Sequence, residues 1–150
     1  MNKQFNKPDL GPEPTNYIPQ RGLKIFIIED ESMVTMLIED ILQDLGYEVA
    51  GNASRIEEAM GKISTLTFDA AILDVNLNGH ETFKIAEKLE SDGVPFLFAT
   101  GYGVHGIPER FHNVAVLPKP FREKDMENAL KAVFSSSFLR NGRPPTAEIR

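Results

Sequence analysis

The sequence predicts an α/β protein built on a five-stranded parallel sheet, with helices on both faces of that sheet. Five short apolar segments, each too short for a helix and rich in Ile, Val, Leu, Ala or Phe, have the composition of buried strands. Segments with apolar residues at helical spacing separate most of them. A repeat of strand and helix of this kind forms a parallel sheet that is covered on both sides.

The first part of the chain alternates strand and helix twice. LKIFII (23–28) predicts a buried strand, and Ser32 is a favourable N-cap for the amphipathic helix behind it. YEVAGNA (47–53) predicts the second strand. We expect Ser54 to cap a second helix that continues to about Ser64, with its apolar residues on one face.

The alternation continues through the middle of the chain. FDAAILDV (68–75) predicts the third strand, and Asn76–Gly79 reads as a loop. A helix is expected over 81–91, followed by the fourth buried strand, VPFLFAT (94–100). These elements place an aspartate and a threonine at the ends of two central strands.

One segment interrupts this rhythm. Where a fourth helix is due, the chain reads GYGVHGIPERFHN (101–113), in which three glycines and a proline leave room only for a helical turn over about 107–112. We therefore predict that the fourth helix is short or mobile. NVAVLP (113–118) predicts the fifth strand, and the last helix is expected over 123–134.

Composition predicts one domain between two tails. The chain has 150 residues and no cysteine, which excludes a disulfide framework, a thiolate zinc site and a cysteine nucleophile. Proline-rich 1–22 and the Ser, Gly and Pro residues of 135–150 predict flexible tails around a domain over 23–134. With no apolar run of the roughly 18 residues that a membrane span needs and no signal-peptide core, we expect a cytoplasmic protein without membrane contact.

The charge is concentrated in this domain. The whole chain has a net charge of −6, whereas 23–134 holds ten bases and nineteen acids. An acidic balance argues against a nucleic-acid partner, which would call for a basic face. Acidic side chains on a solvated surface would explain most of this excess of acids over bases, and a bound cation near some of them is the alternative explanation.

Polar residues gather at the carboxyl ends of the predicted strands, where ligands bind in open parallel sheets. Glu29 and Asp30 follow the first strand, Asp74 ends the third, Thr100 ends the fourth and Lys119 follows the fifth. Each of them alone also fits a surface loop or a turn. Together, at four strand ends of one sheet, they predict a site.

The chemistry of these residue types points to phosphoryl transfer. Crowded carboxylates repel one another unless a cation neutralises them, and hard oxygen ligands suit Mg²⁺. Asp74 is a candidate nucleophile because a carboxylate can form an acyl phosphate. The Thr100 hydroxyl, the Lys119 ammonium and Mg²⁺ would neutralise the charge on the transferred group.

The sequence resembles the receiver domain of two-component response regulators across 23–134. The motifs that carry the resemblance are, in order, KIFIIEDE, AAILDVNLNG, FATGY and LPKPF. The resemblance implies the flavodoxin-like strand order 2-1-3-4-5. It also implies that a sensor histidine kinase phosphorylates Asp74, that Thr100 is the switch hydroxyl, and that Lys119 contacts the phosphoryl group and precedes a cis proline. The Mg²⁺ ligands that it implies are Glu29, Asp30, Asp74 and the main-chain carbonyl of Asn76.

Two features separate the chain from many receivers. Val116 stands where those receivers carry a Tyr or Phe whose ring moves on activation. PFLFATGYG resembles a subgroup of single-domain receivers, often alphaproteobacterial, with a Phe-Ala-Thr-Gly signature and an atypical fourth helix. We therefore expect phosphorylation to order 101–112 around Thr100 and Tyr102 instead of flipping an aromatic ring.

The resemblance implies a bacterial signalling module and not an enzyme. We expect it to stand alone, because nothing after residue 134 could form an output domain, and to act as a monomer or weak dimer on an unidentified downstream protein. A phosphate sink that drains a kinase is an alternative. A Mg²⁺-dependent phosphatase using Asp74 is a weaker one, because Asn76 stands where such enzymes place a second acid. A flavodoxin-like cofactor binder is disfavoured, since EDES replaces a phosphate-binding loop after the first strand.

Overall fold

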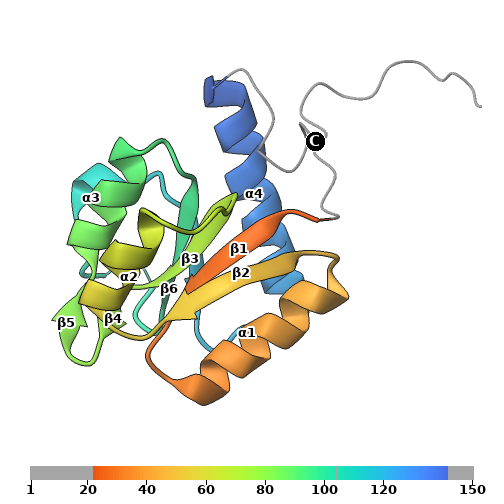
Figure 1. Ribbon diagram of the computed structural model, residues 1–150, viewed down its shortest axis with the longest axis horizontal. Coiled ribbons are helices and arrows are strands. Elements are labelled where there is room, and N and C mark those ends of the chain that lie inside the picture. The colour runs from red at the N-terminus through yellow and green to blue at the C-terminus, as the bar shows by residue number, and fades with distance from the viewer. Residues whose placement is uncertain (1–21, 104, 142–150) are drawn as a thin grey trace, which may run out of the picture.

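The computed structural model describes residues 22–103 and 105–141, with side chains through residue 135. Its main sheet has five parallel strands in the order β2-β1-β3-β6-β7, which is the expected order 2-1-3-4-5 (Figure 1). The strands are β1 (Lys24–Ile28), β2 (Glu48–Ala53), β3 (Ala70–Asp74), β6 (Phe96–Thr100) and β7 (Val116–Pro118). The predicted fold class is confirmed.

Helices cover both faces of the sheet (Figure 1). The helices α1 (Ser32–Asp44) and α4 (Glu123–Asn141) pack on one face, around a core that includes Ile38, Leu42 and Leu130. The other face carries α2 (Ile56–Ile63) and α3 (Phe83–Ser91). The central strands β3 and β6 are buried at all five positions each, which explains why their sequences are continuously apolar before the final polar residue.

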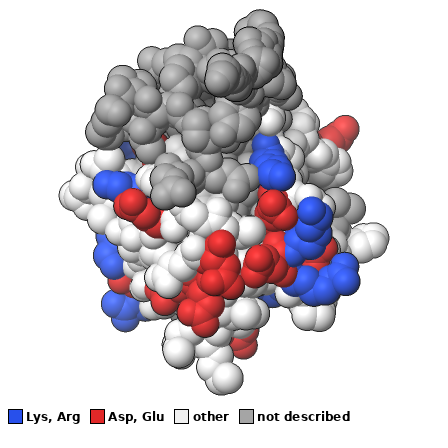
Figure 2. Space-filling model, turned by 90° about the vertical axis from the view of Figure 1, so that its right-hand side faces the viewer, with Lys and Arg blue, Asp and Glu red and all other residues white. Residues whose placement is uncertain are grey.

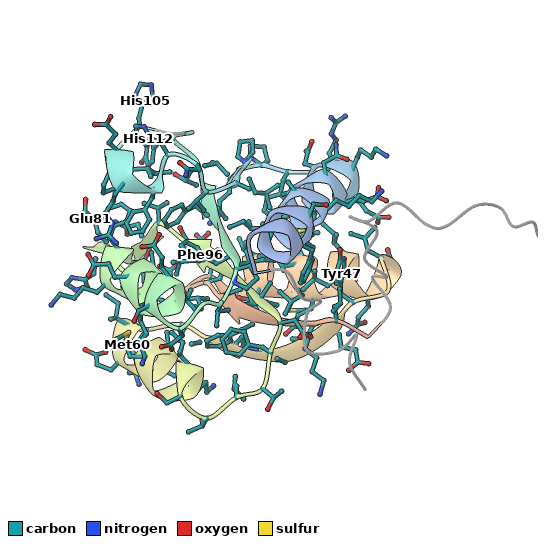
Figure 3. All side chains as sticks on the ribbon, turned by 90° about the horizontal axis from the view of Figure 1, so that it is seen from above. Tyr47, Met60, Glu81, Phe96, His105 and His112 are labelled. Atoms are coloured by element: carbon teal, nitrogen blue, oxygen red, sulfur yellow. The ribbon has the colours of Figure 1, made fainter. Side chains whose placement is uncertain are left out.

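The two faces have separate apolar cores. In the core beneath α4, the Tyr47 ring stacks on Phe134 with centroids 6.1 Å apart, while Phe96 belongs to the core on the α2 and α3 side (Figure 3). Phe96 and Phe98 meet edge to face with centroids 5.5 Å apart. Aromatic residues therefore fill the space between β6 and the short segment that follows it.

In the segment after β6, the described residues 101–103 and 105–113 form a single helical element, the 3₁₀ turn Glu109–Phe111, where a fourth helix is due. Ile107 and Phe111 are buried in the core, and the Phe111 ring contacts Phe98 with centroids 5.7 Å apart. The prediction of a short fourth helix is confirmed. A regular helix would pack one whole apolar face on the sheet, whereas this segment packs on it mainly through Ile107 and Phe111.

Both predicted N-caps are wrong by one residue. Glu31 and not Ser32 caps α1, because the Glu31 N–H donates to Glu29 Oε2 at 3.1 Å and the chain turns there. The first helical bond then runs from Thr35 N–H to the Glu31 carbonyl. Arg55 and not Ser54 occupies the cap position of α2, since the Ala59 N–H bonds to the Arg55 carbonyl.

The loop expected over Asn76–Gly79 is part of a small antiparallel hairpin. Its strands are β4 (Asn76–Leu77) and β5 (His80–Glu81). Asn78 and Gly79 both have positive φ, of 52° and 85°, as a two-residue hairpin turn requires. The Asn-Gly dipeptide is the sequence signal for this turn.

The last helix is longer than predicted. It continues from Glu123 to Asn141, so residues 135–141 are helical where a tail is expected from the sequence. Serine has only a modest helix penalty, and the run of three does not end the helix. Residues 1–21 and 142–150, which hold the rest of the predicted tails, lie outside the described residues.

In the part of the chain that the structure describes, we find no helix with the length and apolar character of a membrane span. The cytoplasmic location stays a prediction.

Candidate functional site

The predicted site residues lie at the carboxyl edge of the sheet. Glu29 directly follows β1, Asp74 is the last residue of β3 and Thr100 is the last residue of β6. The β3–β6 register pairs Asp74 with Ala99, so that Thr100 lies one step beyond it on the neighbouring strand. Lys119 follows β7, and its main-chain N–H donates to the Thr100 carbonyl at 2.9 Å. The parallel sheet therefore brings together residues that are far apart in the chain.

Lys119 bridges two of the carboxylates. Its ammonium lies 2.9 Å from Glu29 Oε1 and 3.0 Å from Asp74 Oδ2. The Glu29 side chain is only 1% exposed and the Asp74 side chain 10%, whereas the Lys119 side chain remains 23% exposed. The Lys119–Pro120 peptide is cis, as the resemblance predicts. The site is a buried acidic pair closed by one partly exposed cation.

Three carboxylates converge here. One oxygen from each of Glu29, Asp30 and Asp74 lies within 4.8 Å of the others. Burial raises the pKa of the Glu29 carboxyl to about 7, and the Asp74 carboxylate adds to this rise against the opposing hydrogen bond from Lys119. Burial by itself would lower the pKa of Lys119, but its hydrogen bonds to Glu29 and Asp74 hold that pKa above its ordinary value. The cluster carries more negative charge than one lysine offsets.

The Asp74 carboxylate is held from both sides. Its Oδ1 accepts a hydrogen bond from the Asn76 main-chain N–H at 3.1 Å, and its Oδ2 faces Lys119. The hydroxyl of Thr82, which is fully buried, donates to the Asp74 main-chain carbonyl at 2.6 Å. Sequence reasoning missed Thr82, because this contact depends on how the intervening hairpin folds back.

Thr100 is buried and engaged with the chain that follows it. Its Oγ1 accepts a hydrogen bond from the Tyr102 main-chain N–H at 3.1 Å. The Tyr102 side chain is 78% exposed. The hydroxyl thus joins the end of β6 to the start of the atypical segment.

Asn76 and Asn78 shape the loop above the carboxylates. The Asn76 side-chain Oδ1 accepts a hydrogen bond from the Gly79 N–H at 2.8 Å, which turns that side chain toward the hairpin. The Asn78 main-chain N–H donates to Asp30 Oδ2 at 2.9 Å. Sequence reasoning missed Asn78, although its Asn-Gly dipeptide marks the turn that carries it.

The donor set fits a magnesium ion. Carboxylate oxygens from three residues within reach of one another are hard ligands of the kind that Mg²⁺ takes together with water and phosphate oxygens. Burial is the main reason that the pKa of Glu29 is raised, and the Asp74 carboxylate adds to it; a divalent cation beside these carboxylates would favour their charged forms. The residues present are therefore compatible with the metal.

Two of the three histidines, His105 and His112, belong to the atypical segment after β6. His105 and His112 are near the short 3₁₀ turn, away from Tyr47 (Figure 3). The His112 Nε2 lies 2.9 Å from the Ile107 carbonyl, a contact that supports the segment itself. The metal-capable cluster found among the described residues contains carboxylates and no histidine.

Carboxylates are also prominent on the surface. On the face shown in Figure 2, Asp and Glu side chains gather in a band with Lys and Arg beside it.

The surface of helix α1 is both acidic and apolar. Its sequence SMVTMLIEDILQD contains acidic residues and no Lys or Arg, and its first half exposes Met33, Met36 and Leu37. Most of the acidic excess therefore lies on the solvated surface, as the sequence predicts.

The chain is similar to proteins of known class. The family model of the response regulator receiver domain matches residues 25–131. The transcriptional regulatory protein PdtaR of Mycobacterium tuberculosis is 27% identical over 122 residues, which are 79% of this chain and 58% of that protein. The chemotaxis protein CheY of Thermotoga maritima is 32% identical over 72 residues, which are 46% of this chain and 60% of that protein. The chain thus spans less than two thirds of the length of these curated relatives.

Two solved structures have a similar fold over about three quarters of this chain. SdrG from Sphingomonas melonis Fr1 is 36% identical, with a TM-score of 0.68 over 75% of this chain and 96% of that chain. The BeF3-activated conformation of SdrG matches with a TM-score of 0.65 at 38% identity, over 73% of this chain and 93% of that chain. With its fold, its acidic cluster and the family match over 25–131, the chain belongs to the response regulator receiver domain family.

Proposed function

We propose that this chain accepts a phosphoryl group on Asp74 from a sensor histidine kinase, in a Mg²⁺-dependent reaction, and then signals by binding another protein. The observation that carries the proposal is the contact of one ammonium with two carboxylates at the sheet edge, where Lys119 lies 2.9 Å from Glu29 and 3.0 Å from Asp74. A partly exposed cation next to a nucleophilic carboxylate is suited to receive a phosphoryl oxygen.

In the proposed reaction, an Asp74 carboxylate oxygen attacks phosphorus. The new O–P bond forms as the P–N bond to the donor imidazole breaks, and the imidazole leaves with that electron pair. The Asn76 N–H, 3.1 Å from Asp74 Oδ1, orients the carboxylate. The Lys119 ammonium, which contacts the Asp74 carboxylate before the reaction, would contact an oxygen of the transferred phosphoryl group after it. We assign Glu29, Asp30, Asp74 and the Asn76 carbonyl to Mg²⁺, which when bound would neutralise negative charge on the phosphoryl oxygens.

Thr100 would carry the signal away from Asp74. Its hydroxyl now accepts the Tyr102 N–H at 3.1 Å. If the Thr100 hydroxyl turned to donate to a phosphoryl oxygen, the Tyr102 backbone that is bonded to it would move as well. Phosphorylation would then change the order of the atypical segment that begins there. Position 116 in β7 is a valine, which has no aromatic ring to flip, so the proposed switch does not depend on one.

We also place the chain in the subgroup with the Phe-Ala-Thr-Gly signature. The support is FATGY at the end of β6, followed by a 3₁₀ turn in place of a regular fourth helix. A similar solved protein, SdrG, is described in a BeF3-activated conformation. A receiver of this type takes its output from protein contacts.

The phosphatase alternative has little support. Asn76 stands at the position of the second acid in such enzymes, and its side chain is engaged with the Gly79 N–H. Receiver domains are signalling domains and not enzymes of the usual kind. A phosphate sink would use the same chemistry at Asp74, so the site does not distinguish it from a messenger. A downstream protein that binds only the phosphorylated form would identify the chain as a messenger.

Incubation with acetyl phosphate and Mg²⁺, followed by intact-mass measurement, tests the proposal. We expect one added phosphoryl group, which is absent when EDTA is present and absent in Asp74→Asn. Asp69→Asn is the matched control at the opposite end of β3, and it should still accept the group. An unmodified wild type would overturn the proposal.

A further inference from the structure

The β4–β5 hairpin lies directly after the proposed nucleophile and reaches back over the acidic cluster. Leu77 anchors it in the core at 1% exposure, and Thr82 ties its base to the Asp74 carbonyl. Asn78 and Gly79 form its turn with φ of 52° and 85°. The tip of the hairpin therefore has a defined position relative to the carboxylates.

Asn78 is bonded to two other loops at this edge of the sheet. Its main-chain N–H donates to Asp30 Oδ2, in the β1–α1 loop, at 2.9 Å. Its side-chain Nδ2 donates to the Ser54 carbonyl, in the β2–α2 loop, at 3.3 Å. One residue thus links three loops, and one of its bonds ends on a carboxylate of the cluster.

We propose that Asn78 is a positioning residue for the metal site, which holds the Asp30 carboxylate in the orientation that binds Mg²⁺. This inference rests on the proposed Mg²⁺-dependent function. Asp30 is only partly buried, and a carboxylate on a partly exposed side chain loses conformational freedom when it becomes a ligand. The bond from Asn78 fixes one oxygen and leaves the other free, so that part of this ordering precedes metal binding.

The backbone conformation of residue 78 is essential to this role. Its N–H points at Asp30 in a turn with positive φ, which Asn and Gly tolerate and a β-branched residue strongly disfavours. Asn78→Val therefore disrupts both the turn and the side-chain bond to Ser54. Asn78→Gly keeps the turn and its N–H, and removes only the bond to Ser54.

A matched control for backbone strain exists at the other end of the sheet. Gly93 follows the C-cap of α3 with φ of 73°, and a Cβ added there meets no atom within 4 Å. Gly93→Val therefore introduces the same disfavoured conformation without touching the carboxylates. Urea unfolding shows that each variant is folded before its affinity for metal is measured.

The experiment is calorimetric titration of the full chain with MgCl₂. Wild type should bind, Gly93→Val should bind with the wild-type affinity, and Asn78→Val should bind about tenfold more weakly, at the low end of the usual effect of removing a partner of a metal ligand. Asn78→Gly should lie nearer wild type; equal weakening in Asn78→Gly would still support the role, with the bond to Ser54 carrying it. Wild-type affinity in a folded Asn78→Val, or equal weakening in Gly93→Val, would overturn the inference and leave the proposed function intact. A wild type that binds no Mg²⁺ would overturn both.

Discussion

The Lys119 ammonium lies 3.0 Å from the Asp74 carboxylate, across 45 residues of sequence. The contact exists because β3 and β7 end at the same edge of a parallel sheet, on either side of β6. Since Glu29 shares the same ammonium at 2.9 Å, the charge balance of the site depends on a single residue.

Removing this ammonium should destabilise the metal-free protein. Lys119→Met leaves the buried Glu29 and the neighbouring Asp74 without their cation, and we expect the free energy of unfolding in EDTA to fall by about 1–3 kcal/mol. Urea denaturation measures it. Mg²⁺ should narrow the difference from wild type, because a bound cation takes over part of the neutralisation.

The control is Lys124→Met, which removes an ammonium 3.4 Å from Glu127 on a side chain that is 71% exposed. Its unfolding free energy should change by less than about 0.5 kcal/mol. Equal losses in the two variants would contradict the special role of Lys119.

The start of α2 should show a pH-dependent contribution from Glu58. The Ser54 N–H, which donates to the Glu58 carboxylate at 3.0 Å, and the Lys62 hydrogen bond hold the pKa of Glu58 below its ordinary value of 4.5. A depressed pKa in the folded state stabilises the protein above 4.5, and this stabilisation is lost as the pH falls through the folded-state pKa. Glu58→Gln should therefore cost about 0.5–1 kcal/mol at neutral pH and nothing in acid.

Urea unfolding of wild type and Glu58→Gln over a pH series measures this difference. Glu57→Gln, at an exposed carboxylate in the same helical turn, is the control, and its cost at neutral pH should be smaller than that of Glu58→Gln. A Glu58→Gln cost that is the same at neutral and acidic pH would argue against a stabilising role of the charged Glu58 carboxylate.

The atypical segment should depend on Phe111 far more than on its ion pairs. Phe111 is 1% exposed and packs on Phe98, so we expect Phe111→Ala to lower the unfolding free energy by about 3–5 kcal/mol. Arg110 pairs with Glu87 and Glu90, but its side chain is 54% exposed, and Arg110→Ala should cost less than about 1 kcal/mol. Denaturant titration of both variants gives the order, and the reverse order would show that the ion pairs hold the segment.

Beryllofluoride with Mg²⁺ should slow amide exchange in residues 101–103 and 105–112. The Tyr102 N–H bonds to Thr100 Oγ1, so engagement of that hydroxyl by a phosphoryl mimic changes the start of the segment. Hydrogen exchange followed by mass spectrometry measures the effect. Thr100→Ser should keep the change and Thr100→Ala should lose it while still binding the mimic. Equal exchange with and without beryllofluoride in wild type would rule out the proposed switch.

Much of the fold is predictable from local sequence. The strands β1, β3 and β6 are apolar except for one terminal polar residue each, and the helices between them have a clear apolar face. Parallel topology then brings the strand ends together, which is why Asp74 and Lys119 could be paired from the sequence. The short fourth helix follows equally from glycine and proline in 101–113.

The contacts that were missed depend on three-dimensional geometry. The bond from Thr82 to the Asp74 carbonyl and that from Asn78 to Asp30 require the hairpin to form and fold back, which no local pattern specifies. The bond from the Glu31 N–H to the Glu29 side chain, two residues earlier, is a local contact, but the preference for Ser at helix N-caps does not anticipate it. The extension of α4 to Asn141 shows that a serine run is a weak stop signal.

The central claim is that Asp74 carries the phosphoryl group, and chemical identification of the modified residue tests it most directly. After incubation with acetyl phosphate and Mg²⁺, borohydride reduction converts an aspartyl phosphate to homoserine, which peptide mass spectrometry can assign to a position. The account predicts homoserine at position 74. Reduction at another carboxylate, or at none, would contradict it.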